Sequence, residues 1–321
     1  MKVKIRTPSR LHLTLIDLNG SIGRIDGGIG FALEEPYVEV IGSESDSLKV
    51  TGDAINLDRF KSVAERLSSI FNKKVEIRVL SDYTPHVGLG SGTQISLAVA
   101  QIYNKLFNLN LSVRELAKIV RRGGTSGIGV SVFEFGGFIL DGGHSIKVKK
   151  GFLPSSASTA PPPPVLSRLD FPDWKVVVVI PNLSGLFGKM EVDLFKKHCP
   201  IPVEDVRKIS HIILMKILPS IVEVDLDSFG SGIWEIQHLG FKKVEINQYG
   251  DLIWDFITTG KEYVPAIGMS STGPAVYAIT DESLKDIVSF AKEYFAERCP
   301  GIDIIKTRGR NKGAEIKVEK T

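Results

Sequence analysis

A proline-rich segment near the middle of the chain limits how the residues on either side can fold. Residues 151–172 read GFLPSSASTAPPPPVLSRLDFP, in which six residues are proline. Proline lacks the backbone N–H that helices and sheets use, and its φ is fixed, so the segment predicts a semi-rigid connection. The 321 residues also exceed what one hydrophobic core usually supports. We therefore expect an N-terminal domain over residues 1–164, a smaller C-terminal domain over residues 165–321, and an active-site cleft between them.

The positive charge of the chain is concentrated at its C-terminal end. The sequence has 40 Lys and Arg against 37 Asp and Glu, and residues 306–321 alone carry a net charge of +4, which leaves −1 on the other 305 residues. A broad basic surface for nucleic acid is therefore excluded, and any bound anion is expected at a focused site. The tail is expected to form a solvated edge that discourages strand pairing, with a lip that attracts a polyanionic substrate as the alternative. Its charged side chains are Lys306, Arg308, Arg310 and Lys312.

The composition is that of a soluble globular protein. With 43% hydrophobic and 24% charged residues, the chain is not disordered, collagen-like or a coiled coil. Its two cysteines, Cys199 and Cys299, offer neither a disulfide framework nor a zinc spacing, so a reducing compartment is expected. The N-terminus lacks the apolar core of a signal peptide, and the strongly apolar stretch 176–180 is too short to cross a bilayer. We expect a cytoplasmic protein with no membrane partner.

The spacing of apolar residues predicts the elements of both halves. Before the proline-rich segment we expect strands over 2–6, 11–18, 31–41 and 74–80 and a glycine-rich turn over 20–30. We also expect a helix over 58–71 and a second that follows the loop 84–94 and ends at about 107. A third helix is expected to begin at a Ser112 N-cap, with Glu115 in a capping box. After it we expect strands over 174–181, 275–280, 302–306 and 314–318 and helices over 204–218 and 284–295, the last strand closing a sheet of the second domain. Without strict βαβ alternation, this order favours an α+β fold.

The strongest chemical motif is the glycine-rich loop at residues 84–94. Its glycines let backbone amides approach a ligand, its hydroxyl residues add hydrogen bonds, and the apolar helix that follows directs its N-terminus at the same place. The expected phosphate-binding residues are Gly88, Leu89, Gly90, Ser91, Gly92, Thr93 and Gln94. No Lys follows the last glycine, so the loop is not a Walker A motif. The alternative is a glycine-rich turn that only begins a helix.

Three motifs resemble those of the GHMP small-molecule kinases. PHVGLGSGTQ at 85–94 is similar to their phosphate-binding loop, MSSTGPAVYAI at 269–279 to their later Ser/Gly-rich motif, and TSGIGVSVFEFGGFILDGG at 125–143 to a segment that begins Ser-Gly-x-Asp in mevalonate-type members. The resemblance implies a two-domain α+β fold, with an N-terminal domain like domain 2 of ribosomal protein S5 and a ferredoxin-like C-terminal domain. It also makes a small-molecule kinase that uses ATP one candidate function.

The departures from the kinase pattern are as informative as the matches. The loop is one residue shorter between proline and glycine, and it has Gly-Thr-Gln at 92–94 where the kinases tend to have Ser-Ser-Ala. Gly129 stands where those kinases place the aspartate that activates the substrate hydroxyl. Glycine can neither accept a proton nor hold a metal, so phosphoryl transfer with that base is disfavoured.

A second resemblance extends over most of the chain. Residues 8–33, 121–144, 152–164 and 198–202 are similar to the β-ribofuranosylaminobenzene 5′-phosphate synthases, which share the GHMP fold and belong to methanopterin-type biosynthesis in archaea. The resemblance implies a glycosyltransferase that joins phosphoribosyl pyrophosphate to 4-hydroxybenzoate or 4-aminobenzoate, with release of CO₂ and pyrophosphate. It also implies Mg²⁺ as a cofactor and a homodimer. The residues leave the choice between the two acids open.

Such a reaction requires groups that stabilise the departing pyrophosphate and groups that handle protons or metal. Arginines can clamp phosphate bidentately, and the candidates are Arg24, Arg121 and Arg122, each with a solvated surface charge as the alternative. The candidate catalytic residues are Asp26, His12, His86 and His144. Asp26 lies in the glycine-rich turn and is the first choice, either as the general base or as a Mg²⁺ ligand. We expect Asp26→Asn to lower turnover by at least about an order of magnitude.

Three hypotheses of function follow from the sequence. The first is the synthase, the second is a kinase of the same fold in which another residue replaces the missing aspartate, and the third is a protein that binds a phosphorylated metabolite without catalysis. Release of CO₂ and pyrophosphate from either acid would support the first. Turnover of ATP that depends on an alcohol would support the second, and tight binding without turnover would support the third.

Overall fold

The computed structural model describes residues 1–319, which form two β-sheets with helices packed on them. The strands are β1 (Lys2–Asp17), β2 (Arg24–Glu44), β3 (Lys49–Thr51), β4 (Val75–Ser81), β5 (Phe138–Asp141), β6 (His144–Ser145), β7 (Val165–Leu169), β8 (Lys175–Pro181), β9 (Ala266–Met269), β10 (Val276–Thr280), β11 (Ile302–Arg308) and β12 (Glu315–Glu319). The helices are α1 (Leu57–Phe71), α2 (Ser91–Leu106), α3 (Val113–Ile119), α4 (Ile128–Phe135), α5 (Lys189–His198), α6 (Val203–Ile212), the π-helical turn η1 (Ile213–Ile217), α7 (Leu218–Glu223), α8 (Leu226–Gln237), α9 (Gly240–Asn247), α10 (Asp251–Gly260) and α11 (Lys285–Arg298). The expected α+β class is confirmed.

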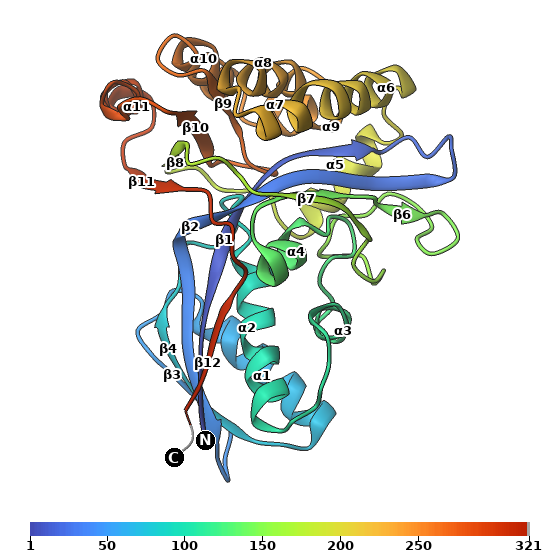
Figure 1. The fold of residues 1–321 in the computed structure, drawn as a ribbon, viewed down its shortest axis with the longest axis vertical. Helices are drawn as coiled ribbons and strands as arrows, with labels where there is room; N and C mark the ends of the chain where they lie inside the picture. Colours follow the sequence, from blue (N-terminus) through green and yellow to red (C-terminus); the bar gives the residue numbers. More distant parts are fainter. Residues whose placement is uncertain (320–321) are drawn as a thin grey trace.

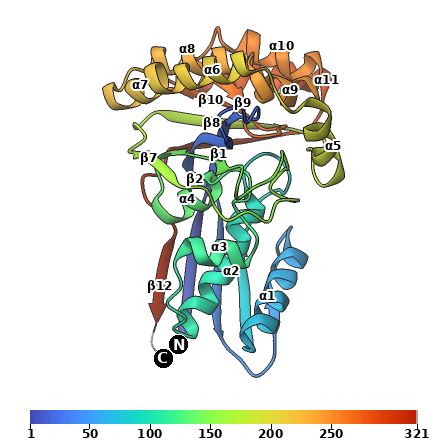
Figure 2. The same cartoon turned by 90° about the vertical axis from the view of Figure 1, so that its right-hand side faces the viewer.

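The first sheet has the order β12-β1-β2-β4-β3, and β5 and β6 also pair with β2. Its pairs are antiparallel except that of β3 with β4. Helices α1, α2 and α3 gather on one face of this sheet (Figures 1 and 2). Helix α2 is the apolar helix that the sequence predicted after the glycine-rich loop, and the structure buries its side chains against β1 and β2. Helix α3 begins with the expected capping box between Ser112 and Glu115.

The second sheet has the order β11-β8-β10-β9 and is covered by a layer of helices. Helices α6 to α11 lie on one side of it, at the top of Figure 1. Strand β8 pairs with β10 on one edge and with β11 on the other. All four valines at 176–179 are buried, so the strand also packs on both faces. Helices α8, α9 and α10 have no counterpart among the elements expected from the sequence.

The glycine-rich segment 20–30 is not a turn over its whole length, which corrects one expectation. The turn ends at Gly23, and β2 begins at Arg24, so the later glycines lie within a strand. Gly30 shows the reason: a Cβ there would lie 2.3 Å from the Leu11 carbonyl oxygen and 2.8 Å from Ile128. The glycines therefore serve close packing of β1, β2 and α4.

Two further expectations are wrong at the level of sheet membership. The strand at 314–318 was expected to close a sheet of the second domain, but β12 pairs with β1 in the first sheet, with Ile316 opposite Ile5. The segment 151–172 was expected to hold only a connection, but β7 lies within it and pairs with β5. Alternating apolar side chains set the existence of a strand, whereas the choice of partner depends on contacts that are distant in sequence. The division of the chain at residue 164 stays a prediction.

The C-terminal tail is only partly a solvated edge. Arg310 is 7% exposed, and its guanidinium bonds both carboxylate oxygens of Glu34 at 2.8 and 2.9 Å and Glu315 at 2.7 Å. Arg308 and Lys312 are exposed, as expected.

Among residues 1–319, every helix is too short or too polar to cross a lipid bilayer.

Candidate functional site

The loop before α2 approaches the turn before β10 so closely that only glycine fits. Gly88 has φ +94°, and a Cβ there would lie 2.3 Å from the Ser270 carbonyl oxygen. Ser270 Oγ in turn donates to the Gly88 carbonyl at 2.8 Å. The two motifs that the sequence analysis singled out, at 85–94 and 269–279, therefore meet in space.

Helix α2 begins at this junction with free backbone amides. Its N-cap is Gly90, which has φ +81° and provides no side chain to cap the first turn. The N–H groups of Thr93 and Gln94 bond back to the Gly90 carbonyl, and those of Ser91 and Gly92 precede them on the open end. Helix N-termini of this kind attract anions through these N–H groups and the helix dipole.

A cavity of about 440 Å³ lies in front of this helix end. Among the residues that form its wall are Gly88, residues 90–93, Gly123, Ser126, Gly129, Ser155, Ser156, residues 186–188, Glu191, Ser271 and Thr272. Residues before and after the proline-rich segment contribute to it. It is the candidate functional site.

Two arginines flank the helix end without a carboxylate partner among the described residues. A Cβ on Gly92 would lie 2.0 Å from Arg59 Nη1 and 3.6 Å from Arg122 Nη2, so both guanidinium groups converge there. Burial and the neighbouring Arg59 lower the pKa of Arg122 to about 10, and burial also lowers the pKa of Arg59. Both groups stay charged at neutral pH, and two cations held together at a helix N-terminus create a positive potential that favours an anion.

Arg10, on β1, is a third cation on the cavity wall. Its Nη1 donates to the Gly88 carbonyl, which ties β1 to the loop, while its Nε has no partner within residues 1–319. A Cβ on Gly90 would lie 3.1 Å from this Nε, so the nitrogen is close to the free end of α2. Burial lowers the pKa of Arg10 to about 10, partly opposed by Tyr83, Glu245 and Glu191.

The cavity wall also carries an aromatic side chain and one carboxylate. Phe187 is 47% exposed, and its ring lies 4.5 Å from the His86 ring, centroid to centroid. Glu191, in the first turn of α5, is the only Asp or Glu among the residues that line the cavity. Burial raises its pKa to about 7. Burial and then Arg59 and Arg122 lower the pKa of His86.

The structure brings together most of the predicted phosphate loop. Gly88, Gly90, Ser91, Gly92 and Thr93 line the cavity, together with His86 and Arg122. Two loop residues point elsewhere: Leu89 is buried in the hydrophobic core, and Gln94 donates from Nε2 to the Gly129 carbonyl at 2.8 Å. Their side chains position the loop and do not face a ligand.

Asp26 and His144 meet in the interior and not on the cavity wall. His144 Nδ1 lies 2.6 Å from Asp26 Oδ2, and Lys149 Nζ lies 3.0 Å from the same oxygen. Lys149 Nζ also donates to Thr125 Oγ1 and to the Leu153 carbonyl, at 3.0 Å each. With its oxygens occupied and its side chain buried, Asp26 is held as a structural anion in this geometry. Its role as base or Mg²⁺ ligand receives no support here.

The remaining candidates also lie away from the cavity wall. The Arg24 guanidinium donates to the carbonyls of Gly142 and Gly143 at 2.8 and 2.9 Å. Arg121 is exposed and does not line the cavity. His12 is buried, and its ring nitrogens have no partner within residues 1–319. Burial, then Arg10 and Lys242, hold its pKa well below the usual value, so the ring is neutral.

Three charged residues of the cavity wall were absent from the sequence-based candidates: Arg10, Arg59 and Glu191. Arg10 lies within the segment 8–33 that resembles the synthases, and it directly precedes an alternating strand pattern. That position in the sequence could have identified it as a candidate site residue. Arg59 and Glu191 lie in the first turns of α1 and α5, where a charged residue usually faces solvent. Only the packing of α1 on α2, and of α5 on the hydrophobic cluster around Leu15 and Phe241, places them at the site.

Gly129 lies on the cavity wall beside the first turn of α2. A Cβ there would lie 3.2 Å from Thr93 Cγ2, so a longer side chain would enter the space in front of the helix. The position that carries the aspartate in the kinases is therefore at the site in this chain, but without a carboxylate.

Within residues 1–319, no group of three or more His, Cys, Asp and Glu side chains is arranged to hold a metal ion.

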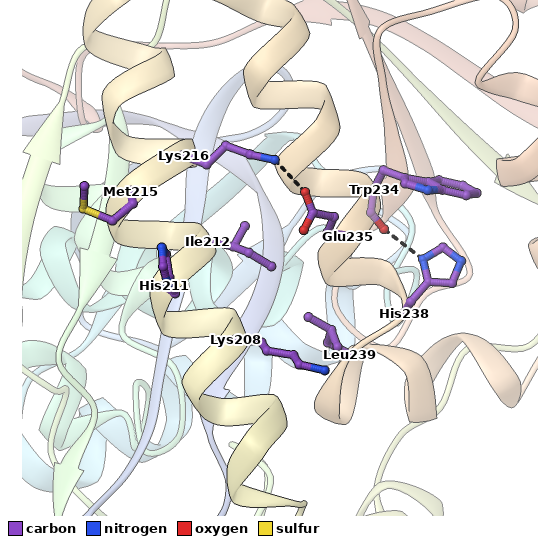
Figure 3. Close-up of a pocket in the computed structure, with 9 residues that line it drawn as sticks. All are labelled: Lys208, His211, Ile212, Met215, Lys216, Trp234, Glu235, His238 and Leu239. Carbon is purple, nitrogen blue, oxygen red and sulfur yellow. Dashed lines mark hydrogen bonds and ion pairs between the residues drawn. The ribbon is translucent and has the colours of Figure 1, made fainter.

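A larger, open cavity of about 750 Å³ lies on the outer helical layer. Figure 3 shows it as a groove between the helix formed by α6 and η1 and the neighbouring α8. Lys216 and Glu235 pair across it at 2.6 Å, and His238 bonds the Trp234 carbonyl at 2.9 Å. None of the expected site residues lines this groove.

The fold and the loop at the N-terminus of α2 define a protein of the GHMP kinase fold. The sequence profile described as the N-terminal domain of GHMP kinases matches residues 58–137, which include that loop. The solved structure of homoserine kinase from Cytophaga hutchinsonii superposes with a TM-score of 0.68 at 16% identity, covering 98% of this chain and 97% of the kinase. The expected fold is confirmed.

Sequence similarity narrows this class to one family. Beta-ribofuranosylphenol 5′-phosphate synthase of Archaeoglobus fulgidus is 55% identical over 316 residues, covering 98% of this chain and 100% of the relative. The synthase of the same name from Methanocaldococcus jannaschii is 46% identical over 329 residues, covering 97% of this chain and 99% of the relative. The chain belongs to the family of beta-ribofuranosylphenol 5′-phosphate synthases.

Proposed function

We propose that the protein condenses phosphoribosyl pyrophosphate with 4-hydroxybenzoate and releases CO₂ and pyrophosphate, in the biosynthesis of a methanopterin-type cofactor. The observation that carries the proposal is the convergence of Arg59 and Arg122 on the free end of α2. Relatives that are about half identical are named for a product in which a phenol bears a ribofuranosyl 5′-phosphate. That name favours 4-hydroxybenzoate over 4-aminobenzoate, the alternative that the sequence left open.

The cationic wall suits the departure of pyrophosphate. As the bond from the anomeric carbon to pyrophosphate breaks, negative charge grows on the leaving group and positive charge grows on the sugar. The amides of Ser91 and Gly92 and the guanidinium groups of Arg59 and Arg122 would stabilise the anion without reorganising. Arg10 would bind the same group from the side of β1.

The acceptor supplies its own electron pair. The ring carbon that bears the carboxylate is electron-rich because of the para oxygen, and it forms the bond to the anomeric carbon. The bond to the carboxylate then breaks, and its electron pair restores the aromatic ring as CO₂ leaves. Because the para oxygen donates an electron pair into the ring as the new bond forms and regains it as CO₂ leaves, no electron-sink cofactor is required.

Mg²⁺ and a homodimer remain proposals. The residues present do not fit a Mg²⁺ ion held by the protein, because the cavity wall carries a single carboxylate and the Asp26 carboxylate is already bonded to His144 and Lys149. We propose that the ion arrives on the oxygens of the pyrophosphate group. The homodimer rests on the family resemblance and on the frequency of two-fold assemblies.

The direct test is an assay of the purified protein with phosphoribosyl pyrophosphate, Mg²⁺ and either acid. We expect CO₂ and pyrophosphate in equal amounts with 4-hydroxybenzoate. Absence of both products with either acid would reject the synthase, turnover of ATP that depends on an alcohol would instead show a kinase, and tight binding without turnover would show a binding protein.

The role of Arg122 in that assay can be measured separately. Arg122→Gln removes a charge-assisted contact worth about 1.5–3 kcal/mol, so we expect the KM for phosphoribosyl pyrophosphate to rise about tenfold or more. Arg78→Gln is the matched control, because Arg78 is exposed on β4 and does not line the cavity. An unchanged KM in the Arg122 variant would remove this residue from the phosphate site.

A further inference from the structure

One part of the cavity wall has a composition that phosphate binding does not explain. Leu186, Phe187 and Glu191 lie together there, on the segment that leads into α5 and on its first turn. An exposed phenyl ring and an isolated carboxylate would both be unfavourable next to a bound pyrophosphate, since the one is apolar and the other repels anions. This side of the cavity therefore suits a different part of the reaction.

The aromatic side chains here form a surface for a flat, partly apolar ligand. The Phe187 ring is half-exposed and contacts the His86 ring on one side. Leu186 packs below it against the cluster around Phe195 and Phe241. Stacked or edge-to-face contact with a benzoate ring at such a surface contributes about 0.5–1.5 kcal/mol beyond the area that is buried.

The Glu191 carboxylate is held at this surface with capacity to accept another hydrogen bond. Its Oε2 accepts from Ser156 Oγ at 3.2 Å, and no other hydrogen bond to the carboxylate is made by the residues that the structure describes. Burial is the main cause of its raised pKa, and Glu245 of α9 adds to it, while Ser156 and Arg10 oppose it. The other titratable side chains on the cavity wall are Arg10, Arg59, Arg122 and His86.

The cavity wall offers two groups that can accept a proton at neutral pH. The arginines stay protonated, and hydroxyl groups are too weakly basic, so Glu191 and His86 remain. The pKa of His86 lies below its ordinary value, whereas that of Glu191 is raised to about 7. The stronger base transfers a phenolic proton more readily, which favours Glu191.

We propose that Glu191 is the general base that takes the phenolic proton of 4-hydroxybenzoate, whose ring lies against Leu186 and Phe187. This inference rests on the proposed function. The proton passes from the phenolic oxygen to the Glu191 carboxylate as the ring carbon forms its bond to the anomeric carbon and pyrophosphate leaves. After CO₂ departs, the phenolate oxygen of the product takes the same proton back, so the enzyme returns to its starting state.

A comparison of the two acids tests this assignment. 4-Hydroxybenzoate needs a base, whereas the nitrogen lone pair of 4-aminobenzoate does not. We expect Glu191→Gln to lower kcat with 4-hydroxybenzoate about 10²-fold and to leave kcat with 4-aminobenzoate within about threefold. Glu191→Asp should restore part of the activity. Glu293→Gln, at an exposed position of α11, is the matched control.

The pH profile gives a second readout that does not depend on the aminobenzoate. Above the pKa of about 7, Glu191 is ionised and can act as a base, and below it the carboxyl is protonated. We therefore expect kcat/KM for 4-hydroxybenzoate to rise with pH through about 7 in the wild type, and this rise to be lost in Glu191→Gln. If the wild type uses only 4-hydroxybenzoate, this profile decides the question alone.

The outcomes separate this inference from the function on which it rests. Absence of wild-type turnover with both acids would reject the function itself. Normal wild-type turnover with equal losses for both acids in Glu191→Gln, or an unchanged pH profile, would overturn the role of Glu191. A loss confined to 4-hydroxybenzoate in His86→Asn and not in Glu191→Gln would identify His86 as the base instead. Asn suits that position because His86 has φ +60°.

Discussion

At the scale of single residues, Gly129 marks the difference between this chain and the kinases that share its fold. It lies on the cavity wall, where a Cβ would be 3.2 Å from the Thr93 side chain at the free end of α2. A carboxylate at this point would occupy the space that attracts phosphate and would satisfy the helix dipole itself. Because glycine has no side chain, the helix end stays available for a larger anion such as pyrophosphate.

Restoring the carboxylate should therefore weaken substrate binding and not create a kinase. We predict that Gly129→Asp raises the KM for phosphoribosyl pyrophosphate about tenfold or more, because it places negative charge beside the phosphate site. Gly129→Asn is the matched control, since it adds the same bulk without charge. Equal effects of the two variants would show that space, and not charge, is what Gly129 provides.

At the scale of elements, three segments around the cavity are fastened by one buried ionic cluster. Asp26 of β2, His144 of β6 and Lys149 are held within hydrogen-bonding distance, and Lys149 also bonds Thr125 and the Leu153 carbonyl. The His144 ring reaches the Pro161 carbonyl through Nε2, at 2.8 Å. The cluster thus joins the start of β2, the turn before α4 and the proline-rich segment, of which the last two contribute Gly123, Ser126 and Ser155 to the cavity wall.

This geometry changes what the Asp26→Asn substitution is expected to show. Neutralising Asp26 leaves Lys149 buried without its anion, so we predict a loss of about 3–5 kcal/mol in the free energy of unfolding, measured by urea denaturation. Turnover should fall because the cavity wall loosens. Asp46→Asn, at an exposed position, is the control. If the variant keeps wild-type stability but has little turnover, the result would support a catalytic role for Asp26.

At the scale of the whole molecule, the two sheets share one hydrophobic core. The Phe31 ring of the first sheet stacks on Phe171 at 3.9 Å between centroids, and Phe171 meets Trp174 and Phe229 of the second half. The last segment of the chain crosses the same boundary, from β11 in the second sheet to β12 in the first (Figure 1). Arg310 lies at the crossing and binds Glu34 and Glu315.

The interactions of Arg310, in the segment between β11 and β12, should therefore contribute measurably to the free energy of unfolding. Glu34 and Glu315 are 34% and 48% exposed, so solvent screens part of the interaction with Arg310. We predict that Arg310→Ala lowers the free energy of unfolding by about 2 kcal/mol in urea denaturation. Arg308→Ala, in which a 65% exposed side chain is removed, should change it by less than about 0.5 kcal/mol. Equal effects of the two substitutions would contradict a special role for Arg310.

The sequence by itself determined the local features of this protein. The glycine-rich loop, the apolar α2, the capping box at Ser112 and the valine-rich β8 follow from residues that are adjacent in the chain, where backbone freedom, helical spacing and burial act locally. Similar motifs, in the same order, also sufficed to expect the fold and the enzyme family.

Only the tertiary structure decided which side chains share a site. Arg59 reaches the cavity because α1 packs on α2, and Glu191 reaches it because α5 packs on the hydrophobic cluster around Phe241. Asp26 and His144 instead turn inward to meet Lys149. The pairing of β12 with β1 likewise could not be predicted from the local sequence pattern. The physical reason is the same in each case: the energy of a charge or a strand edge depends on neighbours that are distant in sequence, and these become defined only when the core has packed.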